Sequence, residues 1–123
     1  MKGLIIKPRW VDLILSGHKK WEIRGSNTKI RGKIALIKSG SGMIFGTVEL
    51  VDSQKLNNEQ LRKGQLLHFV QENELDAVSY KTPHAWVLKN PQILEKPIPY
   101  KHPQGAIIWV NLDDNLFHER EEG

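Results

Sequence analysis

Lys19, Glu22 and Arg24 are the residues whose types and spacing best support chemistry in this chain. They belong to the octapeptide GHKKWEIR at positions 17–24. Burying a glutamate between cations costs several kcal/mol unless the charges are paired, so such clusters tend to mark sites. This trio fits a cleft that binds an anionic, base-bearing ligand, with all three residues as catalytic candidates. The alternative is a structural ion pair on a strand.

Five further residues are candidates for ligand binding. Lys7 and Arg9 suit phosphate groups, and Trp10 can stack on a base for roughly 1–3 kcal/mol, although a core anchor is an equal alternative. Lys20 is a second cation able to stabilise a charged phosphate intermediate. Ser39 opens a Ser-Gly-Ser-Gly run whose backbone N–H groups can meet a phosphate, but a hairpin turn is favoured there.

Metal and cofactor motifs are missing from the sequence. The five histidines show no His-x-His or His-Glu-x-x-His spacing, and the chain has no cysteine. Gly-x-Ser-x-Gly and dinucleotide-binding fingerprints are also absent. We therefore expect no metal and no cofactor, and thiolate catalysis is excluded.

The charge is distributed unevenly along the chain. Residues 1–40 hold ten Lys or Arg and two acids, a net of +8, whereas residues 41–112 are neutral and residues 113–123 carry −4. A basic block on a small domain is typical of polyanion binding, and a solubilising surface is the alternative. Residues 113–123 are interpreted as an acidic C-terminal tail with a frayed end.

Length and composition indicate one globular domain, over residues 1–112. With 123 residues, 39% of them hydrophobic and 26% charged, the chain can build one modest core. No apolar run approaches the roughly 18 residues that cross a bilayer, and no signal-peptide pattern is present. We expect a cytoplasmic protein that makes no membrane contact.

The periodicity predicts a small mixed fold. Strands are expected over residues 3–7, 20–24, 33–38, 43–51, 84–88 and 105–112, the last one buried. Helices are expected from Pro8 to Leu15, ended by Gly17, and from an Asn57 or Asn58 cap to about Arg62, with a second short helix in 65–80. Prolines mark residues 90–103 as an extended, irregular connection. Five to six strands and two to three helices indicate an α+β fold, a small barrel or curled sheet with helices packed on it.

The order of these motifs resembles the ASCH domain family, which has a β-barrel fold of the PUA-like superfamily. A strand is followed by Lys-Pro-x-Trp opening a helix, and then by Gly-x-Lys-x-x-Glu-x-Arg on the next strand. Residues 84–88, Pro-Ile-Pro-Tyr at 97–100 and the Gly105 to Trp109 segment also resemble its C-terminal half. The resemblance covers roughly residues 2–112 and implies a cleft between barrel and first helix.

The resemblance implies an RNA-related role, with RNA or a modified nucleoside or nucleotide as the partner. Some members are ribonucleases, and others hydrolyse the amide of N4-acetylcytidine. The deacetylating members resemble this chain at Gly17, Lys19 and Arg24 but have a threonine nucleophile where this chain has Glu22. The predicted function is therefore a binding domain. The alternatives are a metal-independent ribonuclease or an amidohydrolase, and a protein-interaction module supported only by the unpatterned residues 65–80.

Overall fold

The computed structural model describes residues 1–75 and 81–117 of the chain. It contains six strands: β1 (Lys2–Ile6), β2 (Trp21–Arg24), β3 (Gly32–Lys38), β4 (Met43–Lys55), β5 (His84–Pro99) and β6 (Trp109–Asn111). Its helices are α1 (Pro8–Leu15), α2 (Asn58–Lys63), α3 (Gln65–His68) and α4 (Glu72–Leu75). The predicted α+β class, with a small barrel-like sheet, is confirmed.

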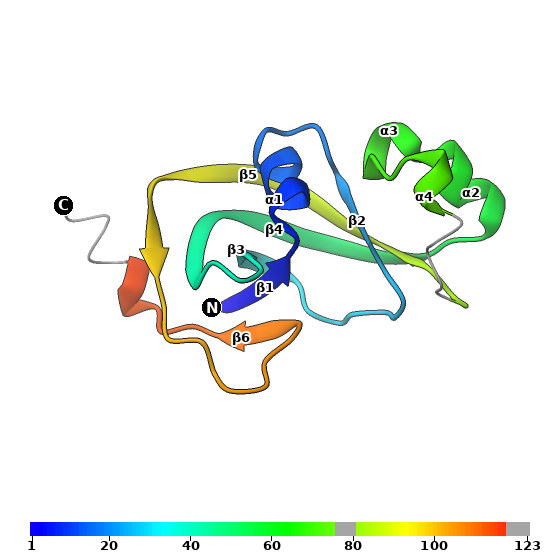
Figure 1. The fold of residues 1–123 in the computed structure, drawn as a ribbon. Coiled ribbons are helices and arrows are strands. Elements are labelled where there is room, and N and C mark those ends of the chain that lie inside the picture. Colours follow the sequence, from blue (N-terminus) through cyan, green and yellow to red (C-terminus); the bar gives the residue numbers. More distant parts are fainter. Residues whose placement is uncertain (76–80, 118–123) are drawn as a thin grey trace.

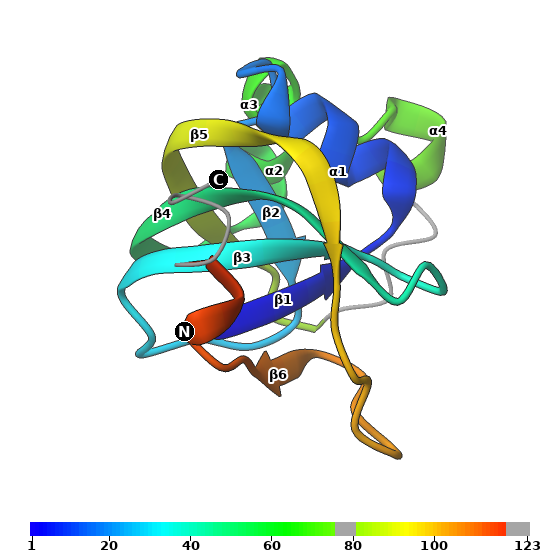
Figure 2. The same ribbon diagram turned by 90° about the vertical axis from the view of Figure 1, so that its left-hand side faces the viewer.

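The six strands form one strongly curled sheet in the order β2-β5-β4-β3-β1-β6. Only β1 and β3 pair in parallel, and the remaining neighbours are antiparallel. Figures 1 and 2 show α1 packed over the curve of the sheet, and α2, α3 and α4 gathered beyond β2. β2 is therefore an edge strand of the sheet, and α3 lies against it.

Helix α1 forms as the sequence predicts. Pro8 occupies the first turn, where its missing N–H loses no bond, and Gly17 follows the helix end with φ 86°. Val11, Ile14 and Leu15 are buried on the sheet-facing side. The helix approaches β4 closely at Gly46, where a Cβ would lie 2.5 Å from a Leu15 methyl and 2.5 Å from the Gln92 carbonyl oxygen.

Strand β5 is longer than the sequence predicted. Residues 89–99 continue the strand that begins at His84, whereas we expected an irregular connection from residue 90. Its pairing with β4 shifts register three times, and Asn90 adopts φ 53° at one of these irregularities. Pro91 and Pro97 fall where no ladder N–H is required, so bulges accommodate both prolines within a strand.

The C-terminal strand is shorter than predicted. Only Trp109–Asn111 pairs with β1, while Ile107 and Ile108 are 79% and 44% exposed. The expected buried strand over 105–112 is therefore wrong at its first half. Tyr100, His102 and Ala106 organise the preceding residues as a loop, in which Nε2 of His102 lies 2.9 Å from the Ala106 carbonyl oxygen. The carbonyl of Ile108 accepts from Ile5 N–H at 2.9 Å, so contact with β1 begins just before β6.

The chain between β4 and β5 holds three short helices instead of the one or two predicted. Asn57 caps α2 with a complete capping box, because its side chain accepts from Gln60 N–H while the Gln60 side chain accepts from Asn57 N–H. Phe69 ends α3 in the left-handed conformation, which separates α3 from α4. Residues 76–80 of the predicted helical segment lie outside the described residues.

The core is made of three neighbouring clusters. The first lies between α1 and the sheet, and Trp86, 2% exposed, stacks there on the partly buried Trp109. The second closes the far side of the sheet, where Leu116 and Phe117 also pack. The third joins β2 to α2 and α4, and it includes Val70 between α3 and α4. The predicted division between a domain and a tail at residue 112 stays a prediction, and residues 118–123 lie outside the described residues.

None of the described helices has the length and apolar composition that crossing a membrane requires.

Candidate functional site

A cleft of about 590 Å³ opens between α1, the end of β1, β2 and the α3–α4 segment. This volume lies in the range typical of small-ligand sites. Its walls combine basic, acidic and apolar side chains, and the lining residues are Ile5, Ile6, Lys7, Arg9, Trp10, Lys19, Glu22, Ile23, Arg24, Ser39, Val70, Asn73, Glu74 and Ile107.

Glu22 is the buried acid of the cleft. It lies on β2 with its side chain 6% exposed, while Trp21 and Ile23 pack on the other face of the strand against the third core cluster. Arg24 donates from both Nε (3.1 Å) and Nη2 (2.9 Å) to Oε2 of Glu22. The Arg24 Nη2 also donates to the Ile5 carbonyl at 3.0 Å, so its position is fixed by β1. One carboxylate oxygen is therefore held firmly.

Lys19 approaches the other oxygen of Glu22. Its Nζ lies 3.6 Å from Oε1, and its side chain is 1% exposed. Strand alternation would place Lys19 opposite Glu22, but Lys19 precedes β2 and follows the left-handed Gly17, so alternation does not apply. Burial lowers the pKa of Lys19 to about 8, against the opposing effect of Glu22. About a tenth of Lys19 is then uncharged at pH 7.

His68 supports Lys19 from behind. The Lys19 Nζ donates to the backbone carbonyl of His68, whose imidazole is fully buried. The Nδ1 of His68 accepts from Val70 N–H at 2.9 Å, and Nε2 lies 2.6 Å from the Leu61 carbonyl oxygen. This pattern requires a proton on Nε2 and none on Nδ1, and burial lowers the pKa of His68. The imidazole is thus a neutral structural element.

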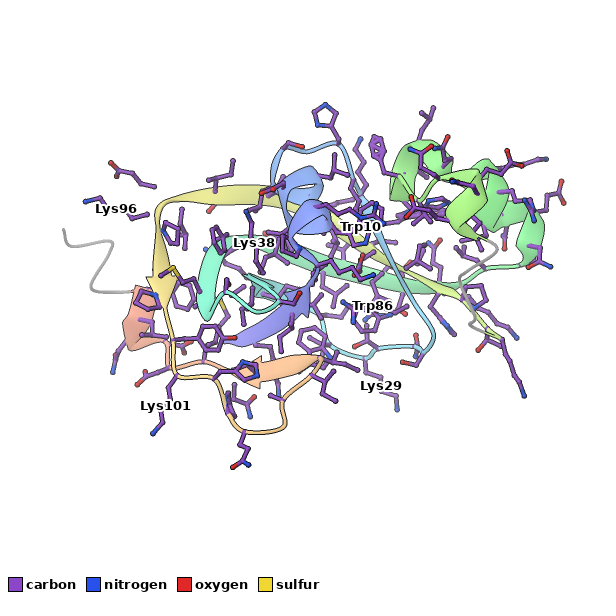
Figure 3. The ribbon with its side chains drawn as sticks, in the orientation of Figure 1. Trp10, Lys29, Lys38, Trp86, Lys96 and Lys101 are labelled. Carbon is purple, nitrogen blue, oxygen red and sulfur yellow. The ribbon has the colours of Figure 1, made fainter. Side chains whose placement is uncertain are left out.

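Trp10 contributes the aromatic wall. Its ring lies 4.0 Å from the Arg9 guanidinium carbon and 4.5 Å from Lys19 Nζ, which are cation–π distances. Trp10 is partly buried and packs against two core clusters. Figure 3 shows it on the side of α1 that faces α2 to α4. The two roles considered from the sequence, core packing and exposure to a ligand, are compatible.

The structure brings seven of the eight predicted site residues to one cleft: Lys7, Arg9, Trp10, Lys19, Glu22, Arg24 and Ser39. The exception is Lys20, which does not line it. Lys20 is exposed beside a separate hollow of about 310 Å³ between the end of α1 and β5, with Lys89 and Asn90. Its backbone joins α3 to β5, since its N–H donates to Leu67 and its carbonyl accepts from Leu88.

Several lining residues were not identified from the sequence. Val70, Asn73 and Glu74 come from the α3–α4 segment, which has no clear hydrophobic period. Ile107 comes from the loop before β6, where an apolar run had indicated a buried strand. Among these residues, only the charge of Glu74 could have indicated a site residue from the sequence. That charge points to the cleft only when it is known that α4 lies opposite Arg9. No grouping of His, Asp and Glu suited to a metal ion occurs among the described residues.

Comparisons with known proteins identify the family. The profile of the ASCH domain matches residues 4–98. A search of curated proteins found no match to the chain. Crystal structures of the ASCH protein of Zymomonas mobilis and of two of its single-residue variants superpose with a TM-score of 0.76 at 15% sequence identity. Each alignment covers 98% of this chain, and 93–96% of the other.

The structural likeness extends over almost the whole chain, which supports the fold, and the profile covers most of the sequence, including the GHKKWEIR octapeptide. Sequence and structure agree on the order of strand, Pro-started helix and motif strand. The chain therefore belongs to the ASCH domain family, whose fold is PUA-like.

Proposed function

We propose that this ASCH domain binds single-stranded RNA or a modified nucleotide in the cleft. The observation that carries this proposal is the meeting of an indole ring, exposed cations and a buried carboxylate in one cleft of nucleotide size. Trp10 and Arg9 lie side by side on α1, and Glu22 lies on β2 below them. Each of these groups addresses a different part of a nucleotide.

The chemistry of each side chain determines which part of the nucleotide it suits. Lys7 and Arg9 are exposed and suit phosphate oxygens. Trp10 offers a face for stacking. The Glu22 oxygen facing Lys19 accepts a hydrogen bond from an exocyclic amino group, as carboxylates do with cytosine. Because Glu22 is already paired with Lys19 and Arg24, a neutral base can bind there without leaving the buried carboxylate unpaired.

Binding is tested by fluorescence anisotropy with short labelled single-stranded RNA at several salt concentrations. We expect salt-dependent binding that Trp10→Ala weakens by roughly 5- to 150-fold, the range of a lost base stack. Lys20→Ala is the control variant, since Lys20 lies outside the cleft, and its effect on affinity is expected to be small. Absence of salt-dependent binding by the wild type contradicts the proposal.

A hydrolase is the second candidate, favoured by one observation. Lys19 has a pKa lowered to about 8, so its uncharged form is available to accept a proton near neutral pH. Under this hypothesis, Lys19 or Glu22 activates a ribose hydroxyl or a water molecule. Incubation with RNA and with N4-acetylcytidine, using wild type, Lys19→Met and Glu22→Gln, tests it. Turnover that persists unchanged in both variants argues against a hydrolytic role of this cleft.

We also propose the domain boundaries and the cytoplasmic location that the sequence predicts, together with RNA or a modified nucleotide as the ligand. A nucleic-acid ligand agrees with the net charge of +8 over residues 1–40. A protein partner has less support, because the α3–α4 segment that motivated it contributes to the cleft through Val70, Asn73 and Glu74.

A further inference from the structure

Glu74 is an acidic side chain at the mouth of a basic cleft. It extends from α4 and forms an ion pair with Arg9 Nη2 on α1. Both side chains are accessible to solvent, with 55% of Arg9 and 31% of Glu74 exposed. Glu22, in contrast, is buried and bound by Arg24 and Lys19 deeper in the cleft. The two carboxylates therefore occupy distinct positions.

The carboxylate of Glu74 occupies space that a phosphate would use. A guanidinium binds carboxylate and phosphate oxygens with the same planar set of N–H donors. The Arg9 hydrogen bond and the nearby charge of Lys7 hold the pKa of Glu74 below its usual range, so the side chain is anionic at neutral pH. Exposed ion pairs contribute little to stability, which makes the contact between Arg9 and Glu74 exchangeable.

We propose that Glu74 is a specificity-determining residue that fills the phosphate position of the unliganded cleft. A ligand phosphate must displace Glu74 from Arg9, whereas a neutral nucleoside enters without this exchange. Glu74 thereby lowers affinity for phosphorylated ligands relative to nucleosides, and its negative charge disfavours additional anionic groups nearby. This inference rests on the proposed function only for the nature of the base-bearing ligand.

The same helix supplies a matched control. Glu72 also lies on α4 but does not line the cleft, and its Oε1 lies 3.5 Å from Nη1 of Arg62 on α2. Glu74→Gln and Glu72→Gln remove one negative charge each and keep the side-chain size. A difference between these variants therefore reports the position of the charge in the cleft, not the net charge of the protein.

The experiment compares wild type, Glu74→Gln and Glu72→Gln by titration with cytidine, cytidine 5′-monophosphate and inorganic pyrophosphate. The readout is the NMR shift of the Trp10 indole N–H, and thermal unfolding confirms that each variant is folded. We expect Glu74→Gln to bind the monophosphate and pyrophosphate roughly three- to tenfold more tightly, with cytidine affinity unchanged. Glu72→Gln is expected to match the wild type.

The outcomes separate this inference from the proposed function. Tighter pyrophosphate binding by Glu74→Gln without any binding of RNA or cytidine compounds supports the inference and contradicts the proposed function. Cytidine 5′-monophosphate that binds the wild type, and binds Glu74→Gln no more tightly, overturns the inference and leaves the proposed function standing. If Glu74→Gln binds cytidine and its monophosphate more tightly by the same factor, the effect is steric, and the inference is overturned. The inference is also overturned if pyrophosphate binds neither the wild type nor Glu74→Gln.

Discussion

The Nζ of Lys19 lies 3.6 Å from Oε1 of Glu22, and both side chains are nearly inaccessible to solvent. Arg24 binds the other oxygen of the same carboxylate, so Lys19 and Arg24 both pair with one buried acid. Glu22 is the group on which this arrangement depends, because removing its charge would leave Lys19 buried without its acidic partner. The titration of Lys19 consequently depends on Glu22.

Replacing Glu22 by Gln should lower the pKa of Lys19 below its value of about 8. Burial lowers this pKa in the wild type, and the charge of Glu22 is the main opposing contribution. Without that charge, the neutral amine is favoured further. NMR titration of the Lys19 side chain measures the change. Lys38, paired with Asp12 on the surface, serves as an internal reference, and a Lys19 pKa that rises or stays constant contradicts the assigned pairing.

The buried lysine should also make stability increase with pH. Its pKa is about 8 in the folded state and about 10.5 when unfolded, so the unfolded chain binds more protons between these values. The free-energy cost of burying the charged Lys19 is fully present below pH 8 and is relieved as the pH rises toward 10.5. It amounts to on the order of 3 kcal/mol, at 1.36 kcal/mol per pKa unit.

Lys19→Met isolates this contribution, because the other titrating groups are common to both proteins. Urea unfolding between pH 7 and 10 should show the free energy of unfolding of the wild type rising relative to that of Lys19→Met. A pH-independent difference between the two proteins would mean that Lys19 titrates normally.

Periodicity and turn chemistry located most of the fold because they report on local structure. Pro8 and Gly17 bound α1 as predicted, and Asn57, one of the two predicted cap positions, begins α2. The extension of β5 beyond residue 88 could not be predicted, since Pro91 and Pro97 are tolerated only where bulges in the pairing with β4 remove the need for an N–H. These bulges arise from the pairing of β4 with β5, so the sequence of β5 alone does not show them.

The candidate site was predictable where its residues are close in sequence. Lys19, Glu22 and Arg24 share one octapeptide, and Lys7, Arg9 and Trp10 flank the start of the helix before it. Lys20 belongs to the same charged run but its neighbour Lys19 takes the buried position, a choice decided by the backbone after Gly17. Glu74 and Ile107 reach the cleft only through tertiary contacts, so no local pattern could identify them.

His68 should be less protonated at pH 6 than a free histidine, and its neutral form should be the Nε2–H imidazole. Its Nδ1 accepts from Val70 N–H and its Nε2 faces the Leu61 carbonyl, so a second proton on Nδ1 breaks the first bond. Because the folded pKa is lowered, the stability that this imidazole provides is present above pH 6.5 and is lost as the pH falls below that value. ¹⁵N NMR of the imidazole at pH 6 measures the tautomer.

Replacement of His68 by Leu should cost about 2–4 kcal/mol in unfolding free energy, because the Val70 N–H and the Leu61 carbonyl lose their buried partner. His18→Leu is the surface control, since His18 is exposed and the one hydrogen bond of its imidazole among the described residues is to the Ser16 hydroxyl. A His68 as protonated at pH 6 as a free histidine, or equal stability of the two variants, would contradict the assigned hydrogen bonds.

The salt dependence of RNA binding should identify the cations that meet phosphate. Lys7 is exposed at the mouth of the cleft, whereas Lys96 on β5 is equally exposed but lies well away from Trp10 (Figure 3). Each lysine that neutralises a phosphate of a single strand adds about 0.7 to the slope of log affinity against log salt. Lys7→Ala should therefore flatten the slope by about 0.7, and Lys96→Ala should leave it unchanged, as measured by anisotropy at four salt concentrations. Equal slopes for the two variants would place the phosphates outside this cleft, because both variants lose the same net charge and differ only in where that charge lay.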